Sequence, residues 1–134
     1  MIRFDPTLIV ERMRVVRDSH VAYDERFHDG LNIISGDNSS GKSTILNFLF
    51  YGLGGDLFDW SAVAKLCTKV YVQVRINGNV ATLAREISTT PRRSMDLFPG
   101  EIEKALKAGV EDWARYPYIR LSVVRTFGAK WGAD

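Results

Sequence analysis

Residues 36–44 read Gly36-Asp37-Asn38-Ser39-Ser40-Gly41-Lys42-Ser43-Thr44, and this stretch decides which fold the rest of the chain can adopt. It fits the phosphate-binding pattern G-x-x-x-x-G-K-[ST] at every fixed position. One apolar run, residues 31–34, precedes the stretch, and a second, residues 45–50, follows it. Because the pattern requires a strand before the loop and a helix after it, these flanks predict a strand–loop–helix unit.

The residue types of this stretch suit a polyanion. Glycines at positions 36 and 41 permit backbone conformations that a Cβ would forbid, so the loop can approach a phosphate closely. Its N–H groups and those at the helix start would face the phosphates, with the positive end of the helix dipole behind them. Lys42 would reach the β and γ phosphates, the Ser43 hydroxyl would complete the coordination of Mg²⁺, and Thr44 would serve the helix start.

We therefore expect a nucleoside triphosphate site with Mg²⁺, in which Ser43 is the metal ligand and no residue is catalytic. The alternative is an ordinary polar loop before a buried helix, and the three fixed elements with both flanks favour the nucleotide site. The predicted cofactor-binding residues are Gly36, Asp37, Asn38, Ser39, Ser40, Gly41, Lys42, Ser43 and Thr44.

The composition is that of an ordinary globular domain. The chain has 134 residues, of which 46% are hydrophobic and 25% charged, so neither disorder nor a membrane protein is indicated. The longest apolar stretch, residues 45–53, is far shorter than the roughly 18 residues that span a bilayer, and Arg3 and Asp5 stand where a secretory signal would be apolar. We expect a cytoplasmic protein with no membrane partner. The net charge of +2 is too small to argue for nucleic acid.

Hydrophobic periodicity predicts the elements around the loop. Residues 7–17 and 20–27 show the pattern of two strands, and a helix over residues 43–51 would turn Ile45, Phe48, Leu49 and Gly52 toward a sheet. The run Gly52-Leu53-Gly54-Gly55 would end that helix.

The clearest fold signal after the loop is a hairpin around Asn77-Gly78, a pair typical of type I′ turns. A two-residue turn would place Val74 opposite Ala81 and Val72 opposite Leu83. Beyond it we expect a short helix over residues 101–108 and a last strand over residues 118–124. The inward residues of that helix would be Ile102, Ala105 and Leu106.

Four arginines lie close together before the loop, and two interpretations of them stay open. Arginine suits phosphate recognition, yet it also serves plain surface strands, and the second interpretation is favoured here. The four residues are Arg12, Arg14, Arg17 and Arg26.

A strand pair before the loop and an antiparallel hairpin after its helix resemble the N-terminal lobe of the SMC/RecN/RecF/SbcC group of ABC-type ATPases. The approach to the loop, residues 27–44, is similar to that group's, as are Asn38 within the loop and Tyr51-Gly52-Leu53-Gly54 at the helix end. The resemblance covers roughly residues 7–87. It implies an α/β fold, a P-loop NTPase N-terminal lobe whose mixed sheet surrounds the strand–P-loop–helix unit with antiparallel strands.

The resemblance also implies a Walker A site for ATP and Mg²⁺ and a role in DNA repair, maintenance or defence. Such proteins pair N-terminal and C-terminal halves into one head and close two heads around ATP. The implied partners are therefore the C-terminal half, a second copy in an ATP-held homodimer, and DNA. Base preference and DNA contact stay open.

The chain departs from the family pattern where hydrolysis is concerned. The family commonly has glycine where Ser39 stands. The single glutamine, Gln73, lies within a predicted strand, and Glu111-Asp112 follows no strand, so neither the Q-loop glutamine nor the Walker B carboxylates are recognised. A signature motif and a coiled-coil region are also missing. The chain would bind phosphate without activating water.

We accordingly interpret residues 1–134 as one partial ATP-binding domain, the N-terminal part of a longer ATPase head, with residues 88–134 as an extension. It would be an ATPase only within the complete head. Two alternatives stay open: the N-terminal region of an OLD-like ATPase/nuclease, which a C-terminal metal-binding nuclease domain would reveal, and a non-hydrolysing nucleotide-binding regulatory module.

Overall fold

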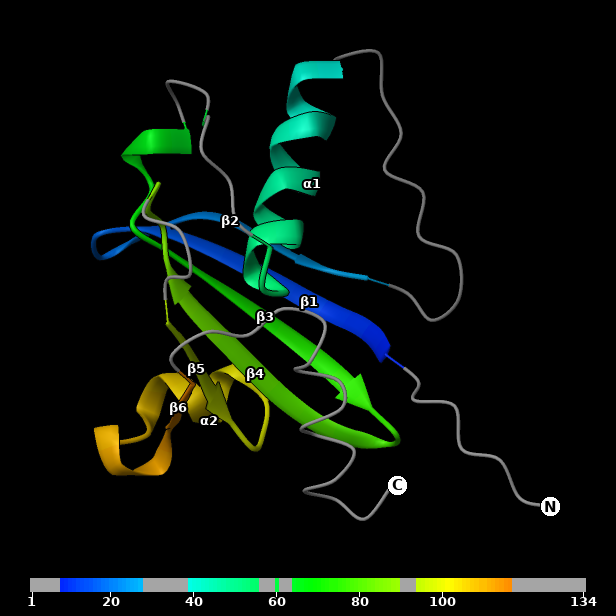
Figure 1. Cartoon of the computed structure of the whole chain (residues 1–134), viewed down its shortest axis with the longest axis vertical. Helices are drawn as coiled ribbons and strands as arrows, with labels where there is room; N and C mark the ends of the chain where they lie inside the picture. The colour runs from blue at the N-terminus through cyan, green and yellow to red at the C-terminus, as the bar shows by residue number, and fades with distance from the viewer. Residues whose placement is uncertain (1–7, 28–38, 56–59, 61–63, 90–93, 117–134) are drawn as a thin grey trace, which may run out of the picture.

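The computed structural model describes residues 8–27, 39–55, 60, 64–89 and 94–116 (Figure 1). They form a sheet with helices on both of its faces. In chain order the elements are β1 (Leu8–Arg17), β2 (His20–Arg26), α1 (Ser39–Gly52), the 3₁₀ turn η1 (Ala64–Leu66), β3 (Lys69–Ile76), β4 (Asn79–Glu86), β5 (Met95–Phe98), α2 (Ile102–Lys107), the 3₁₀ turn η2 (Val110–Asp112) and β6 (Ala114–Tyr116).

The sheet has six strands in the order β2-β1-β3-β4-β5-β6, and neighbouring strands are antiparallel throughout. The predicted hairpin is confirmed, because Val74 pairs with Ala81 and Val72 with Leu83. Asn77 and Gly78 have φ angles of 52° and 85°, as a type I′ turn requires. The short turn thus fixes which side chains of β3 and β4 share a face.

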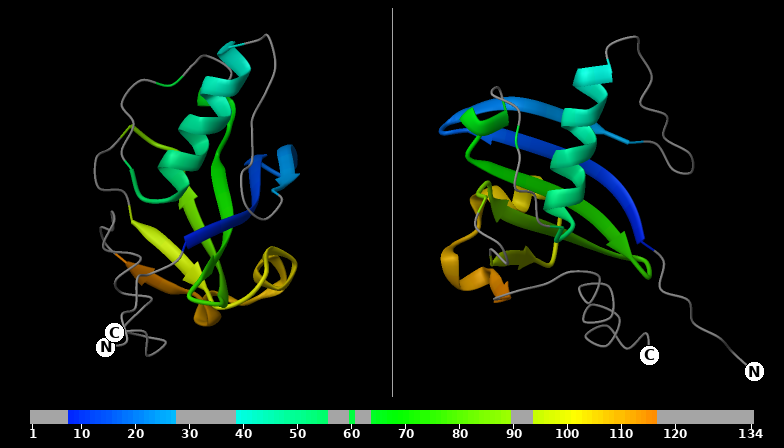
Figure 2. Two further views of the ribbon diagram at one scale, coloured as in Figure 1. Left: turned by 90° about the vertical axis from the view of Figure 1, so that its right-hand side faces the viewer. Right: turned by 45° about the horizontal axis from the view of Figure 1, so that its top comes forward.

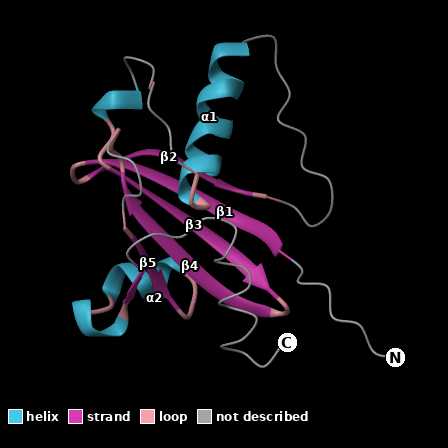
Figure 3. Ribbon diagram, in the orientation of Figure 1, coloured by secondary structure: helices cyan, strands magenta, loops and turns pink. Residues whose placement is uncertain are grey.

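Strand alternation divides the sheet into two faces. One carries the main core, in which Met13, Val72 and Leu83 of the strands belong to the same buried cluster as Phe48 and Tyr51 of α1. The opposite face carries α2, whose Ile102 backbone N–H donates to Gln73 Oε1 at 3.1 Å. Because Val72 and Gln73 are adjacent in β3, their side chains point to opposite faces. The two helices therefore cover opposite sides, as Figure 2 and the colouring of Figure 3 show.

The second half of helix α1 packs closely against the sheet. Phe48 and Tyr51 are buried, and Gly52 lies so close to β3 that a Cβ built on it would be 2.5 Å from Val72 Cγ2. Ile45 and Leu49 pack at the margin of the same core. The predicted inward side is confirmed, with Tyr51 as an addition.

The end of α1 matches the prediction, whereas its start lies earlier in the chain than predicted. The helix begins at Ser39, four residues before the predicted start, since serine and glycine in the loop are compatible with a first helical turn. Its predicted end is confirmed: the Gly55 N–H donates to the Phe50 carbonyl at 3.0 Å and the Gly54 N–H to the Tyr51 carbonyl at 3.1 Å. Gly54 has a φ of 110°. These two bonds form a Schellman motif.

Helix α2 is shorter than predicted and buries fewer residues. It spans Ile102–Lys107 and leaves the helical conformation at Ala108, whose ψ is 153°. Ile102 and Ala105, three residues apart, are buried, whereas Leu106 is 43% exposed. The prediction of an inward Leu106 is therefore wrong, because so short a helix presents only one narrow side to the sheet.

Two predicted strands, residues 31–34 and 118–124, lie outside the described residues. The strand leading into the loop is the element that would have made the sheet mixed, so that part of the predicted fold stays a prediction. Among the described residues, none of the helices is long and apolar enough to cross a membrane.

Candidate phosphate-binding site

The predicted site residues divide into two groups. Gly36, Asp37 and Asn38 lie outside the described residues. Residues 39–44 form the first turns of α1, and of their side chains only the partly buried Thr44 is described. The described part of the site is therefore the helix start that the pattern places directly after the loop.

The start of α1 has the properties of an anion site. A helix of 14 residues leaves its first N–H groups without partners inside the helix and carries a partial positive charge at that end. Its first turn contains no acidic residue that would occupy this position. In Figure 1 and the right-hand view of Figure 2, the N-terminal end of α1 extends past the edge of the sheet formed by β2. This geometry fits a phosphate group.

The other end of α1 is held by an arginine that the sequence analysis missed. Arg85, on β4, is 1% exposed. Its Nη1 donates to the Tyr51 carbonyl at 3.0 Å and to the Gly55 carbonyl at 2.6 Å. Its guanidinium carbon lies 4.2 Å from the centre of the Tyr51 ring. The available signal was its position: Arg85 follows Ala81 and Leu83 at intervals of two, which places it on the buried face of the strand.

Aromatic packing completes this anchor. The Tyr51 hydroxyl donates to the Glu86 carbonyl. Trp60 packs edge-on against the Tyr51 ring, with ring centres 5.1 Å apart, and tilted against Phe48 at 5.4 Å. Trp60 is itself buried, so its ring belongs to the core. Three aromatic rings and one guanidinium thus gather where α1 ends.

Gln73 and Asp112 have structural roles in the described residues. Gln73 Nε2 donates to Glu11 Oε1 at 3.0 Å, on the face opposite α1. Asp112 Oδ2 accepts a hydrogen bond from the Gly109 N–H at 3.2 Å, within the turn after α2. Burial acts to raise the pKa of Glu11, but the hydrogen bonds from Gln73 and Arg75 and the charge of Arg75 together outweigh it, so the pKa lies below its ordinary value. Both side chains therefore have structural partners, and the absence of a water-activating role stays a prediction.

The interpretation of the arginine cluster as plain surface is wrong for Arg12, which is only 7% exposed. Its Nε and Nη2 donate to the two carboxylate oxygens of Asp24, each at 2.8 Å, and Nη1 pairs with Glu103 of α2. Arg14 bonds the same aspartate at 2.8 Å. The hydrogen bond from Arg12 is the main reason that the pKa of Asp24 lies below its ordinary value. These pairs join β1 and β2 to α2 through charge.

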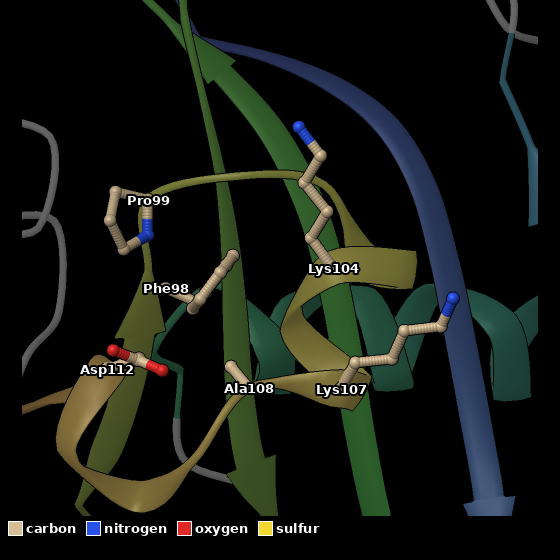
Figure 4. Close-up of a pocket in the computed structure, with 6 residues that line it drawn as sticks. All are labelled: Phe98, Pro99, Lys104, Lys107, Ala108 and Asp112. Atoms are coloured by element: carbon tan, nitrogen blue, oxygen red, sulfur yellow. The ribbon is translucent and has the colours of Figure 1, made fainter.

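An open hollow of about 480 Å³ lies beside α2. Figure 4 shows that the amines of Lys104 and Lys107 point away from Asp112. The charged groups therefore do not converge on one ligand position. The lining residues are Phe98, Pro99, Lys104, Lys107, Ala108 and Asp112. Within the described part of the chain, histidine, cysteine and carboxylate side chains do not gather in groups of three or more that could hold a metal.

Residues 8–107 match a family model described as AAA domain, and this match covers more than half of the chain. The chain belongs to the AAA domain family. This is an AAA-type ATPase family whose domain is found in SMC-like proteins. A comparison with curated proteins found no match. Family membership indicates a nucleotide-binding ATPase domain, which implies a nucleotide bound together with a divalent metal.

Proposed function

We propose that this AAA domain binds ATP with Mg²⁺ through residues 36–44, as the N-terminal part of an SMC/RecF-like ATPase head. The observation that carries the proposal is the complete G-x-x-x-x-G-K-[ST] pattern running directly into α1. The family match adds support, since its range includes the whole pattern. The antiparallel strand pair before the loop and the hairpin after α1 have the order expected of such a lobe.

In this proposal the chain supplies binding and orientation. Backbone N–H groups of the loop and of the start of α1 hold the phosphates, and Lys42 contributes a positive charge toward the β and γ positions. Ser43 contributes its hydroxyl to the metal. Mg²⁺, when bound, neutralises charge on the phosphate oxygens.

Hydrolysis would depend on groups from a second lobe. The carboxylates that complete the metal shell and activate water are not recognisable in the sequence, and Gln73 and Asp112 already have structural partners. We therefore propose that the C-terminal half of an ATPase head supplies these groups, and that two heads close around ATP. A role in DNA repair, maintenance or defence is proposed on the resemblance alone.

The test is calorimetric titration of Mg²⁺-ATP into the purified chain, with phosphate release followed in parallel. Lys42→Ala should weaken binding at least about tenfold, because it removes a charged phosphate contact. The matched control is Lys107→Ala, an exposed lysine on α2, which should bind ATP as the wild type does. Phosphate release should stay at background.

Equal ATP affinity in the wild type and Lys42→Ala would refute the site. Weakening by Lys107→Ala as large as that by Lys42→Ala would point to a general charge effect. Steady ATP turnover by the chain alone would overturn the assignment of hydrolysis to a second lobe.

A further inference from the structure

Arg85 is a charged side chain in a place where a hydrophobic one would fit. The inward positions of β4 around it hold Ala81 and Leu83, which are buried in the main core together with Val72 of β3. Burying a guanidinium costs free energy that hydrogen bonds offset only when their geometry is good. A buried charge is therefore weak evidence of a contribution to stability, and its position requires a further reason.

The hydrogen bonds of Arg85 provide that reason. Its Nη1 donates to the carbonyls of Tyr51 and Gly55, two groups at the C-terminal end of α1. This end carries the negative pole of the helix dipole, and the last turn of α1 itself contains no basic residue. A strand residue thus supplies the cation that the helix lacks there.

Directional bonds control an orientation that apolar packing leaves adjustable. Phe48 and Tyr51 fix the distance of α1 from the sheet, but apolar contacts tolerate small rotations and sliding. Arg85 restricts both the rotation and the sliding of α1, because it bonds the carbonyls of Tyr51 and Gly55 and places its guanidinium carbon 4.2 Å from the centre of the Tyr51 ring.

Because α1 is long, a small tilt of the helix about its C-terminal end produces a larger displacement of its N-terminal end, where the phosphate would bind. Tyr51 and Ser39 are roughly 18 Å apart along a helix axis that rises about 1.5 Å per residue, so a tilt of about 5° would displace Ser39 by about 1.5 Å. A displacement of this size disturbs hydrogen bonds to a bound phosphate, which require close heavy-atom distances.

We propose that Arg85 is a positioning residue for the nucleotide site, acting through α1 on the loop at its other end. The inference rests on the proposed function, because it concerns the same site. It assigns Arg85 an effect on ATP affinity that exceeds its effect on stability.

The experiment compares three variants with the wild type. Arg85→Met removes the donors and keeps an apolar side chain of similar length, and Arg85→Lys keeps a cation. The control is Ile102→Ala, which shortens a fully buried residue on the opposite face of the sheet. For each we would measure the urea midpoint, the Mg²⁺-ATP affinity at a temperature where the variant is folded, and hydrogen exchange of the α1 backbone amides.

Arg85→Met should weaken ATP binding roughly tenfold, the change produced by losing one phosphate hydrogen bond of ordinary strength. Its α1 amides should exchange faster, the first turns included. Arg85→Lys should lie between Arg85→Met and the wild type in both measurements, and it is the informative variant if Arg85→Met does not fold. Ile102→Ala should lose stability while its ATP affinity stays within about twofold of the wild type, since distant sites act independently.

Wild-type ATP affinity in a folded Arg85→Met or Arg85→Lys variant would overturn the inference, as would equal weakening by Ile102→Ala. The exchange measurement separates this failure from that of the proposed function. If Lys42→Ala binds ATP as the wild type does, the nucleotide site is wrong, and unchanged exchange of α1 in the Arg85 variants would then overturn the anchoring as well.

Discussion

Gly52 lies where α1 passes close to β3, and Gly52→Ala tests that contact with a single added methyl group. The new Cβ would stand 2.5 Å from Val72 Cγ2, and the next nearest atom, Val70 Cγ1, would be 3.5 Å away. Val72 is fully buried in the middle of the sheet. Its methyl group therefore has no open space to enter, so either α1 or β3 must shift.

The magnitude follows from two opposing effects. Forcing an extra methyl into a packed core costs about 1–3 kcal/mol. Replacing glycine by alanine inside a helix gains up to about 1 kcal/mol, but Gly52 is the last helical residue, where this gain is smaller. We expect a net loss of about 1–2 kcal/mol in the free energy of unfolding.

Urea denaturation followed by far-ultraviolet circular dichroism measures this loss. The matched control is Gly55→Ala, whose Cβ would stand 2.2 Å from Cε2 of the Phe50 ring. That contact is nominally tighter, but the Phe50 side chain is 54% exposed and can turn away. Gly55→Ala should therefore cost less than about 0.5 kcal/mol, because only an exposed ring has to move and the backbone hydrogen bonds of residue 55 are kept.

A double-mutant cycle with Val72→Ala identifies the cause. Removing the opposing methyl groups should relieve the clash, so the double variant should be more stable than the sum of the two single losses predicts, by about 1 kcal/mol or more. A neutral or stabilising Gly52→Ala would refute the close approach of α1 to β3. Additive losses would show that the cost arises elsewhere than at Val72.

Two further predictions concern the sheet. The hydrogen bond from Arg12 lowers the pKa of Asp24, so the contribution of this carboxylate to stability is complete above its ordinary pKa of 3.8 and is lost as the pH falls through the lowered pKa. Urea midpoints of the wild type should therefore fall over that acid range, and Asp24→Asn should flatten the decline. An equal decline in both proteins would contradict a stabilising Arg12–Asp24 pair. Gly78→Ala should lower stability by about 1–2 kcal/mol, and its φ of 85° is the cause because a Cβ there would meet no atom within 4 Å. Asn77→Gly, at a φ of 52°, should be nearly neutral when both variants and the wild type are compared by thermal melting. Similar melting points for all three proteins would argue against the type I′ turn.

The elements that the sequence predicted well are those with a local cause. The β3–β4 register follows from Asn77-Gly78, because only a few residue types adopt two successive positive φ angles. The end of α1 follows from Gly54, whose φ of 110° disfavours other residues. The buried side of α1 follows from helical spacing, which placed Phe48 and Gly52 on the sheet.

The features that the sequence did not predict depend on partners far along the chain. Arg12 bonds Glu103, 91 residues away, and Arg85 bonds Tyr51 and Gly55, 34 and 30 residues away. The pattern of charges within one strand does not show whether a helix distant in the sequence will cover a charged side chain of that strand. For that reason the sequence favours a surface position for Arg12 and gives no prediction for Arg85.

The amino-acid order alone therefore specifies a phosphate-binding pattern, the helix after it and the hairpin beyond, because backbone sterics and side-chain periodicity act over a few residues. The folded chain adds which face α1 covers, how closely Gly52 approaches Val72, and which arginines become buried. These properties arise from packing between distant segments, where the free energy of burying a charge depends on every group brought around it.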